Sequence, residues 1–109
     1  MTKKSNWPTP LPVQRVVHQF GEDIAIWRKL QRLTVAQVAD RAGVNINTLR
    51  RLEHGRGSVS LENMLRVARA LGLLDKLASV LDPYETDVGR LRADERLPER
   101  VRPPRSSDA

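Results

Sequence analysis

The chain has 109 residues, 4% aromatic residues, no cysteine and a formal net charge of +6. This length supports one domain with tails around a small aliphatic core. The absence of cysteine excludes disulfides, thiolate zinc sites and cysteine nucleophiles. The sequence has no apolar run of membrane length and no signal peptide, so we expect a cytoplasmic protein without a membrane partner.

The positive charge is concentrated in the first half of the chain. Residues 1–57 carry 10 Lys or Arg against 4 Asp or Glu, whereas residues 58–109 carry 9 of each. A phosphate backbone is a natural partner for a surface with such an excess. On charge alone, a basic surface that serves only solubility is the alternative.

The first 12 residues contain three prolines, Lys3, Lys4 and Trp7, and show no hydrophobic periodicity. We therefore predict a flexible N-terminal arm over residues 1–12. A basic arm can reach into a DNA groove or along phosphates. The alternative is a disordered terminus without a partner, with Trp7 docked on the domain.

From residue 13 to about residue 32 the sequence predicts the first helix of the domain. Its apolar residues recur at helical spacing: Val13, Val16, Val17, Phe20, Ile24, Trp27 and Leu30. Gly21 lies within this stretch, where glycine is less favourable than alanine by about 1 kcal/mol. It therefore marks either a bend or a later start of the helix.

The stretch from residue 33 to residue 55 predicts two short helices joined by a tight turn. Thr34 is suited to the N-cap of the first helix. The buried face of that helix is expected to consist of Val35, Val38, Ala39 and Ala42. Gly43 is suited to the left-handed conformation that ends this helix, and Asn45 to the N-cap of the next one.

The second of these helices has two distinct faces. Leu49 and Leu52 point inward, and at about 100° per residue Asn47, Arg50 and Arg51 centre on the opposite side. Asn and Arg are side chains that contact base edges through two hydrogen bonds at once. The sequence therefore predicts a helix-turn-helix with a recognition helix.

The pattern LT..Q.A..AGV....L.R.E.G over residues 33–55 resembles the Cro/C1-type (XRE) family of helix-turn-helix regulators. The resemblance extends over about residues 20–81 and rests on Ala39, Gly43, Val44, Leu49, Glu53 and Gly55. The family often has Gln at the position of Val35, whereas here Gln37 lies nearby on another face. The resemblance implies an all-α, five-helix lambda-repressor-like domain over residues 13–82. It also implies a structural ion pair between Arg28 and Glu53.

The motif provides candidate contacts to double-stranded DNA. The candidates for base edges are Asn45, Ile46, Asn47 and Arg51, with Ile46 suited to a thymine methyl group. The candidates for phosphates are Thr34, Gln37, Arg50 and Arg56. His54 can interact with the helix dipole or with a phosphate. One recognition helix reads only a few base pairs, so we expect a homodimer on a palindromic operator.

Two more helices are expected before residue 83. Ser60 is suited to cap the first, and Gly72 to end it. The expected buried residues of that helix are Leu61, Met64, Leu65, Val67, Ala68 and Leu71. The second runs from residue 73 to residue 81 with a wide apolar stripe. Part of this stripe covers the core, and the remainder predicts a dimer seam through Leu74, Leu77 and Leu81.

Residues 83–109 form an Arg-rich C-terminal tail, in which six arginines mix with six acidic residues and four prolines. Its apolar residues are too sparse for a core, although a short helix is expected around residues 86–96. Three interpretations remain for residues 84–105. The segment folds on a protein partner, it clamps DNA phosphates through Arg100, Arg102 and Arg105, or it is a solvated tail.

The sequence contains no catalytic motif, and its two histidines lack metal-ligand spacing, so we expect no catalytic residue, metal or cofactor. We predict a sequence-specific transcriptional repressor. Residues 60–83 together with the tail are similar to HipB-like antitoxins, which implies autoregulation and a HipA-like kinase toxin as partner. The alternatives are a protein-interaction module that inhibits a kinase-type partner, with DNA binding secondary, and a stand-alone phage-type repressor.

Overall fold

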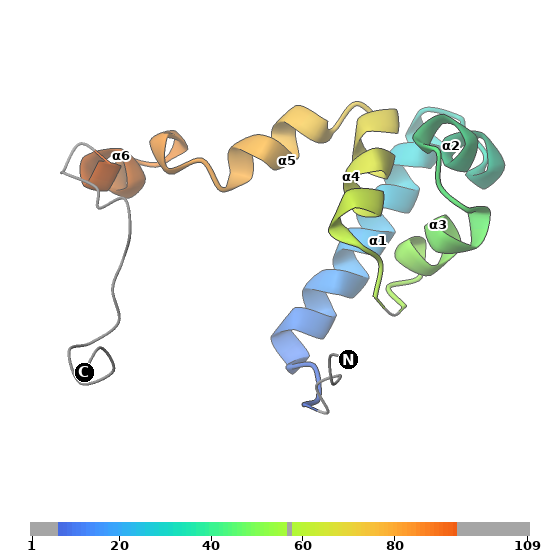
Figure 1. The fold of residues 1–109 in the computed structure, drawn as a ribbon, viewed down its shortest axis with the longest axis horizontal. Helices are drawn as coiled ribbons and strands as arrows, with labels where there is room; N and C mark the ends of the chain where they lie inside the picture. The colour runs from blue at the N-terminus through green and yellow to red at the C-terminus, as the bar shows by residue number, and fades with distance from the viewer. Residues whose placement is uncertain (1–6, 57, 94–109) are drawn as a thin grey trace, which may run out of the picture. The chain divides into compact units, whose positions relative to one another are not determined.

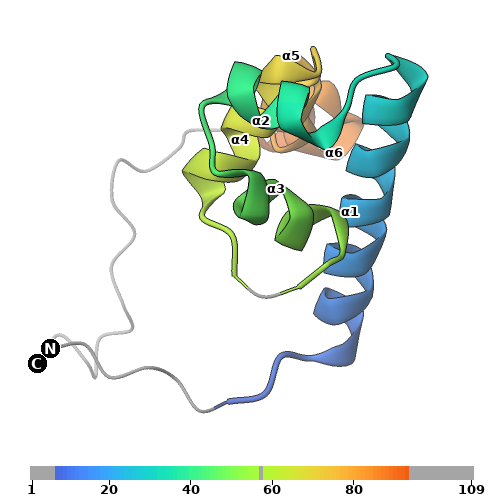
Figure 2. The ribbon, with the colours of Figure 1, turned by 90° about the vertical axis from the view of Figure 1, so that its right-hand side faces the viewer.

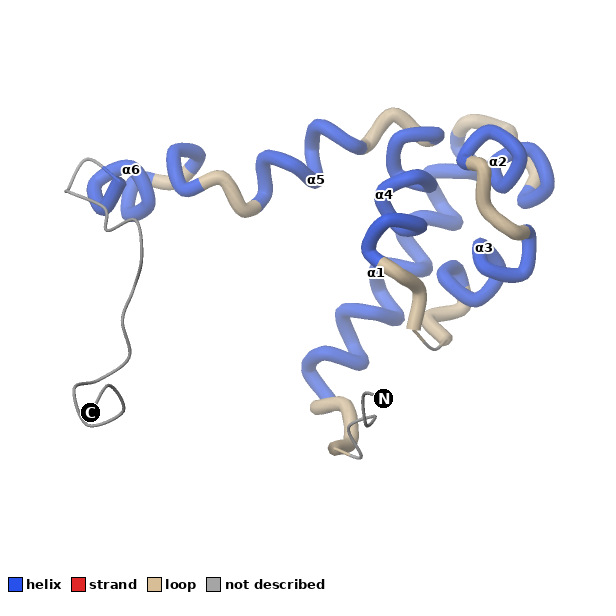
Figure 3. The backbone as a smooth tube through the Cα atoms, in the orientation of Figure 1, coloured by secondary structure: helices blue, strands red, loops and turns tan. Residues whose placement is uncertain are grey.

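The computed structural model describes residues 7–56 and 58–93, which contain helices and no strand (Figure 3). The backbone contacts divide the chain into two units, Met1–Asp75 and Lys76–Ala109, and each is described by itself. The expected roles of Lys3 and Lys4 in the arm lie outside the described residues. The same holds for the tail contacts expected of Arg100, Arg102 and Arg105.

The first unit contains the predicted helix-turn-helix (Figure 1). Its helices are α1 (Leu11–Leu30), α2 (Val35–Ala42), α3 (Ile46–Glu53) and α4 (Leu61–Ala70). Helix α5 (Leu74–Val80) spans the boundary between the units, and the second unit adds the short 3-10 helix η1 (Pro83–Glu85) and α6 (Asp87–Ala93). The expected all-α fold is confirmed, and α6 is the short helix expected in the tail.

Helix α1 starts at residue 11, two residues earlier than expected, and runs without interruption through Gly21. Pro12 lies in its first turn, where a missing backbone N–H is tolerated because it has no partner within the helix. Gly21 is buried, and a Cβ atom there would overlap the carbonyl oxygen of Leu52. Gly21 thus marks neither a bend nor a start, and it allows α1 to approach the end of α3.

Only the middle of α1 reaches the core. Ile24 is 3% exposed and Phe20 packs against the core cluster, whereas Val16 is 67% and Leu30 68% exposed. The reason is length, because α1 has 20 residues and the helices α2 and α3 have 8 each. The first turns of α1 therefore extend past the other helices of this unit (Figure 2).

The core cluster is aliphatic and joins the first four helices. It consists of Ile24, Val38, Ala39, Ala42, Leu49, Leu52, Val67 and Leu71. The inward faces expected for α2 and α3 are confirmed, with Val35 only partly buried. The expectation for Leu61 is wrong: it is 67% exposed because it is the first residue of α4, beyond the end of the core.

The expected helix caps are present. The Thr34 hydroxyl accepts a hydrogen bond from the Gln37 amide (3.0 Å), and the Ser60 hydroxyl accepts one from the Asn63 amide (3.1 Å). Gly43 has φ +70° at the end of α2, as the tight turn requires. An unexpected feature is Arg32, which follows α1 with φ +57°, a conformation that usually selects glycine or asparagine.

The described part of the tail is held by local hydrogen bonds. The Thr86 hydroxyl accepts from the Gly89 amide at the start of α6 (2.9 Å), and Arg90 donates to the Tyr84 carbonyl (2.9 Å). Val88 and Leu91 are both exposed. Within the described ranges of the whole chain, no helix is both long enough and apolar enough to cross a membrane.

Candidate nucleic-acid interface

The inner face of α3 is anchored in the core. Leu49 is fully buried and Leu52 nearly so, and both belong to the cluster that joins α1, α2 and α4. Asn45 caps the helix, because its side-chain oxygen accepts a hydrogen bond from the Asn47 amide (2.7 Å). An 8-residue helix is not stable alone in water, so this packing fixes the orientation of α3.

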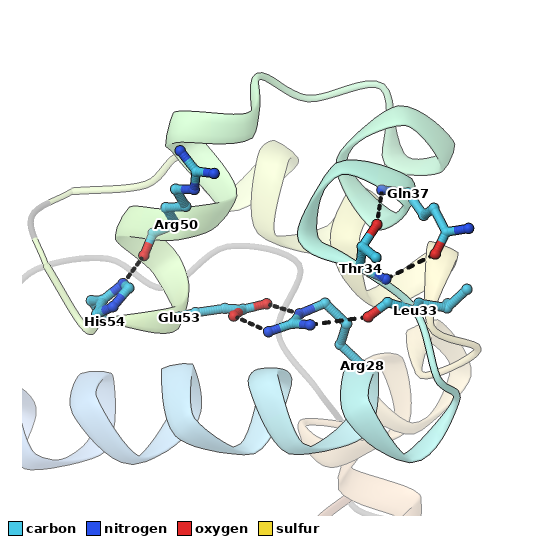
Figure 4. Close-up of polar contacts among 7 residues, drawn as sticks. All are labelled: Arg28, Leu33, Thr34, Gln37, Arg50, Glu53 and His54. Atoms are coloured by element: carbon cyan, nitrogen blue, oxygen red, sulfur yellow. Dashed lines mark hydrogen bonds and ion pairs between the residues drawn. The ribbon is translucent and has the colours of Figure 1, made fainter.

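An ion pair ties α3 to α1, as the family resemblance implies (Figure 4). The Arg28 guanidinium donates two hydrogen bonds to the Glu53 carboxylate, from Nε (2.8 Å) and from Nη2 (3.0 Å). Its remaining amine donates to the Leu33 carbonyl oxygen (3.0 Å). Donation of these hydrogen bonds to the Glu53 carboxylate raises the pKa of Arg28, and burial partly opposes this effect. Arg28 therefore holds both the end of α3 and the connection between α1 and α2 directly before the N-cap of α2.

Two glycines bring the end of α3 against α1. Any side chain at Gly21 would meet the backbone at Leu52, and its Cβ would lie 3.0 Å from the Glu53 carbonyl oxygen. Gly55 has φ +64°, and a Cβ there would lie 2.8 Å from the His18 Cα atom. This close approach at Gly21 is not predicted from the sequence, although a glycine inside a strong helical pattern indicates that another backbone passes nearby.

The outer face of α3 presents polar side chains to solvent. Asn47, Arg50 and Arg51 are exposed, as predicted from helical spacing. The one carboxylate of this helix, Glu53, is turned inward by its ion pair. The outer face therefore offers amide and guanidinium donors without a negative charge of its own, which suits base edges and phosphates.

The structure limits two of the residues predicted to contact bases. The Asn45 side-chain oxygen is engaged in the N-cap, so its amide nitrogen is the group that can donate to a base. Ile46 is partly buried and packs against the core, so only part of its side chain faces outward. Both residues lie at the start of α3, the part of a recognition helix that enters the major groove.

The residues predicted to contact phosphates at the start of α2 bind each other. The Thr34 backbone amide donates to the Gln37 side-chain oxygen (2.9 Å), completing a capping box with the bond from the Gln37 amide to the Thr34 hydroxyl. In Figure 4 the side-chain nitrogen of Gln37 points away from Thr34. That nitrogen is the donor available to a phosphate.

The end of α3 carries the other basic candidates. The His54 ring nitrogen Nδ1 lies 2.7 Å from the Arg50 carbonyl oxygen, so Nδ1 carries the proton in this contact. His54 thus caps the last turn, while the Arg50 side chain remains exposed. Arg56 is exposed directly after the helix, and its backbone amide donates to the Arg51 carbonyl (2.9 Å). Four basic or imidazole side chains therefore lie in the last turn of α3 or directly after it: Arg50, Arg51, His54 and Arg56.

The arrangement of the donors on α2 and α3 suits binding of nucleic acid. Within the described ranges, no group of three or more His, Asp or Glu side chains is placed to hold a metal ion. The donors on α3 and α2 point outward from helices whose inner faces are fixed. The site can therefore position a rigid helix against a DNA duplex.

Comparison with known families gives the same assignment. Residues 24–76 match the family model described as helix-turn-helix. No curated protein and no solved structure matches the chain. The matched segment begins inside α1 and ends inside α5, so it includes both helices of the motif and the Arg28–Glu53 pair. We conclude that residues 24–76 form a helix-turn-helix domain, and this match supports binding of DNA by the domain.

Proposed function

We propose that the protein is a transcriptional repressor that reads a specific operator through the outer face of α3. The observation that carries this proposal is the contrast on one short helix. Leu49, Leu52 and Glu53 fix it to the domain, while Asn47, Arg50 and Arg51 are left exposed. Repression follows if the operator overlaps a promoter, because the bound domain then excludes polymerase.

Selection of bound duplexes from a random DNA library tests this proposal. We expect one enriched motif made of two inverted half-sites whose centres are about 34 Å apart on one face of the duplex. The Arg56→Ala variant should bind all duplexes more weakly and lower the slope of log affinity against log salt by about one. Equal recovery of all sequences would contradict specific reading.

We further propose a homodimer, because two half-sites require two recognition helices. The proposed seam is the apolar stripe of α5, through Leu74, Leu77 and Leu81. Leu81 directly follows the helix and is 88% exposed, which supports a role in contact with a second copy. Charging Leu77 (Leu77→Glu) should abolish dimers in sedimentation and remove cooperative operator binding.

A matched control separates the seam from general effects of added charge. Val88→Glu places the same side chain at an exposed apolar position in α6, outside the seam. We expect this variant to sediment like the unmodified protein. A folded Leu77→Glu protein that remains dimeric would show that the seam lies elsewhere.

We also propose that the repressor is an autoregulating antitoxin of the HipB-like kind, with a kinase-type toxin bound by residues 84–105. The described part of this segment supports a protein contact, because Tyr84, Val88 and Leu91 are exposed apolar side chains on short local elements. A few apolar anchors between charged residues are typical of segments that bind a protein surface.

Truncation after Pro83 tests the tail, because the interpretations predict opposite losses. If the tail binds a protein, operator affinity and its salt slope stay almost unchanged and capture of the kinase-type partner is lost. If it clamps DNA, affinity falls for every sequence and the slope shrinks by up to about 0.9 for each lost phosphate contact. Loss of neither function would show that the segment is a solvated tail without a partner.

A second candidate function is a protein-interaction module that inhibits its partner, with DNA binding secondary. The exposed apolar side chains of the second unit favour this alternative. The exposed Asn47, Arg50 and Arg51 argue against it, because a module without DNA binding has no need of an uninterrupted donor face. Inhibition of the partner by an Asn47→Ala/Arg51→Ala double variant measures how far the two functions are separable.

A further inference from the structure

An apolar groove opens beside the recognition helix, between the N-terminal half of α1 and the connection from α3 to α4. Its volume is about 370 Å³, which is within the range of about 300–1,000 Å³ at which proteins bind small organic ligands. The apolar lining includes Val16, Val17, Phe20, Val59 and Met64. The groove lies wholly within the first unit of the chain.

The outer walls of this groove are not needed by the core. Phe20 and Val59 pack against the core cluster, whereas Val16, Val17 and Met64 are outside it. Val16 and Val17 also lie upstream of the segment that matches the helix-turn-helix family, so this wall is an addition to the motif. Its position relative to α3 is fixed, because α1 and the end of α3 touch at Gly21 and Gly55.

The charged groups of the groove are all positive. Its lining contains the side chains of Arg51 and Arg56 and the hydroxyl of Ser58, and no carboxylate. Among the described residues neither guanidinium is in an ion pair. Two guanidinium groups at the edge of an apolar surface are complementary to a ligand with a hydrocarbon chain and one anionic end.

A second copy of the chain is a less suitable occupant. In a two-fold symmetric contact through this groove, the Arg51 and Arg56 side chains of one copy would face those of the other copy. Like charges brought together at an interface oppose association. A small ligand with an apolar chain and one anionic group can contact the same apolar residues, and its charge neutralises Arg51 and Arg56.

We propose that this groove binds a small apolar carboxylate, with its hydrocarbon chain against Val16, Val17 and Met64 and its carboxylate on Arg51 and Arg56. Binding of the ligand and binding of DNA then exclude each other, because both use the same two guanidinium groups. The mutual exclusion of ligand and DNA rests on the proposed contacts of Arg51 and Arg56 with DNA, whereas the binding of the carboxylate does not. With both steps, the protein is a regulator that releases its operator when the carboxylate accumulates.

Octanoate is the probe for the binding step, with octanol as the neutral molecule of equal chain length. Titration of the full ¹⁵N-labelled chain without DNA should move the backbone amide signals of Val16, Gly55 and Val59 in a saturable way. Octanol lacks the charge-assisted hydrogen bonds, so it should bind at least about ten times more weakly. Equal affinity of the two probes, or no shift at these residues, would overturn the proposal.

Two variants on one helix form a matched pair. Val16→Trp fills the groove from α1, whereas Val13→Trp places the same side chain on an exposed position three residues away that does not line it. We expect octanoate shifts to disappear in Val16→Trp and to persist in Val13→Trp. Arg56→Gln should weaken octanoate about tenfold and leave octanol unchanged. Persistence of octanoate shifts in Val16→Trp would overturn the site.

The DNA step is measured separately, on any duplex that the protein binds. Octanoate should raise the apparent Kd for DNA in the Val13→Trp variant and leave it unchanged in the Val16→Trp variant. Octanoate binding without an effect on DNA would overturn mutual exclusion. The absence of a preferred operator would contradict the proposed repressor function and would leave the octanoate titration, which contains no DNA, as the test of the groove.

Discussion

Guanidinium groups lie on both sides of α3, and their surroundings differ. On the inner face, the Arg28 guanidinium meets the Glu53 carboxylate, and the two side chains are 12% and 7% exposed. On the outer face, Arg50 and Arg51 are exposed and have no carboxylate partner among the described residues. The nearby carboxylate and the burial, more than the residue type, separate a structural arginine from one that is available to DNA.

This comparison leads to a general expectation about substitutions in the domain. Changes on the inner face should alter the free energy of unfolding, and they should alter DNA binding only through loss of folded protein. Changes on the outer face should alter DNA binding at constant stability, because surface substitutions away from special contacts usually stay within about 0.5 kcal/mol.

The largest effect is expected from Glu53→Gln. The substitution keeps the shape of the side chain and removes its charge, which leaves the partly buried Arg28 guanidinium without a counter-ion. Breaking a fully buried pair on one side costs about 3–5 kcal/mol, and for this partly buried pair we expect a loss at the lower end of that range. Urea unfolding followed by circular dichroism measures the loss.

The control for this change is Glu62→Gln. Glu62 pairs with Arg66 at 3.0 Å, but their side chains are 77% and 49% exposed. Exposed pairs contribute about 0–1 kcal/mol, so the control should unfold almost like the unmodified protein. Equal losses for the two variants would remove the distinction between the inner pair and an ordinary surface pair.

The next largest effect is expected from Asn47→Ala on the outer face. Loss of a base contact should weaken binding to the selected operator by about 1–3 kcal/mol, with little change on random duplexes. Fluorescence anisotropy at fixed salt concentration measures both affinities. Because the Asn47 side chain is exposed, the urea midpoint should stay unchanged. A shifted midpoint would place Asn47 among the structural residues.

A smaller effect is expected from Gly21→Ala, which tests how closely α1 approaches α3. The added methyl group overlaps the Leu52 carbonyl oxygen, and overpacking of this kind costs about 1–3 kcal/mol. The better helix propensity of alanine offsets about 1 kcal/mol of that cost. Because the overlapped atom belongs to the backbone, the cost lies at the upper end of this range, and we expect a net loss of about 2 kcal/mol in the free energy of unfolding.

The control is Gly72→Ala, at a site with open space around the missing Cβ and φ +77°. This variant carries only the conformational penalty of the left-handed region, about 1 kcal/mol. A Gly21→Ala protein as stable as the unmodified chain would show that the two helices separate readily and that α3 is less rigidly held than the contacts indicate.

The smallest effect is expected from Arg32→Asn. Arg32 has φ +57° after the end of α1, and asparagine tolerates this conformation better than arginine. We expect a gain of about 0.5 kcal/mol in the free energy of unfolding. DNA affinity should stay the same, because Arg32 is on neither α2 nor α3. A loss of stability would mean that the Arg32 side chain makes contacts that matter more than its backbone.

The sequence predicted local features well because they depend on neighbouring residues. The caps at Thr34, Asn45 and Ser60 follow from side chains that bind backbone groups two or three positions away. The turn at Gly43 follows from the ease with which glycine adopts a positive φ. The family resemblance added the Arg28–Glu53 pair, which joins residues 25 positions apart and which no local pattern shows.

Features that depend on where one element ends relative to another could not be predicted. The apolar spacing of Val16 or Leu30 is the same whether or not a neighbouring helix reaches that turn, so the exposure of both needed the structure. The close contact at Gly21 and the groove beside α3 are long-range features of the same kind. Ile46 differs from its prediction in the opposite direction: it is expected to face DNA, and in the structure it is partly covered because it packs against the core.

The most direct test of the outer face is the base preference of the Arg51→Ala variant, determined by selection from the same random DNA library as the unmodified protein. We expect the variant to keep the half-site spacing and the urea midpoint and to lose preference at one or two positions in each half-site. An unchanged motif at full affinity would contradict the assignment of α3 as the helix that reads DNA.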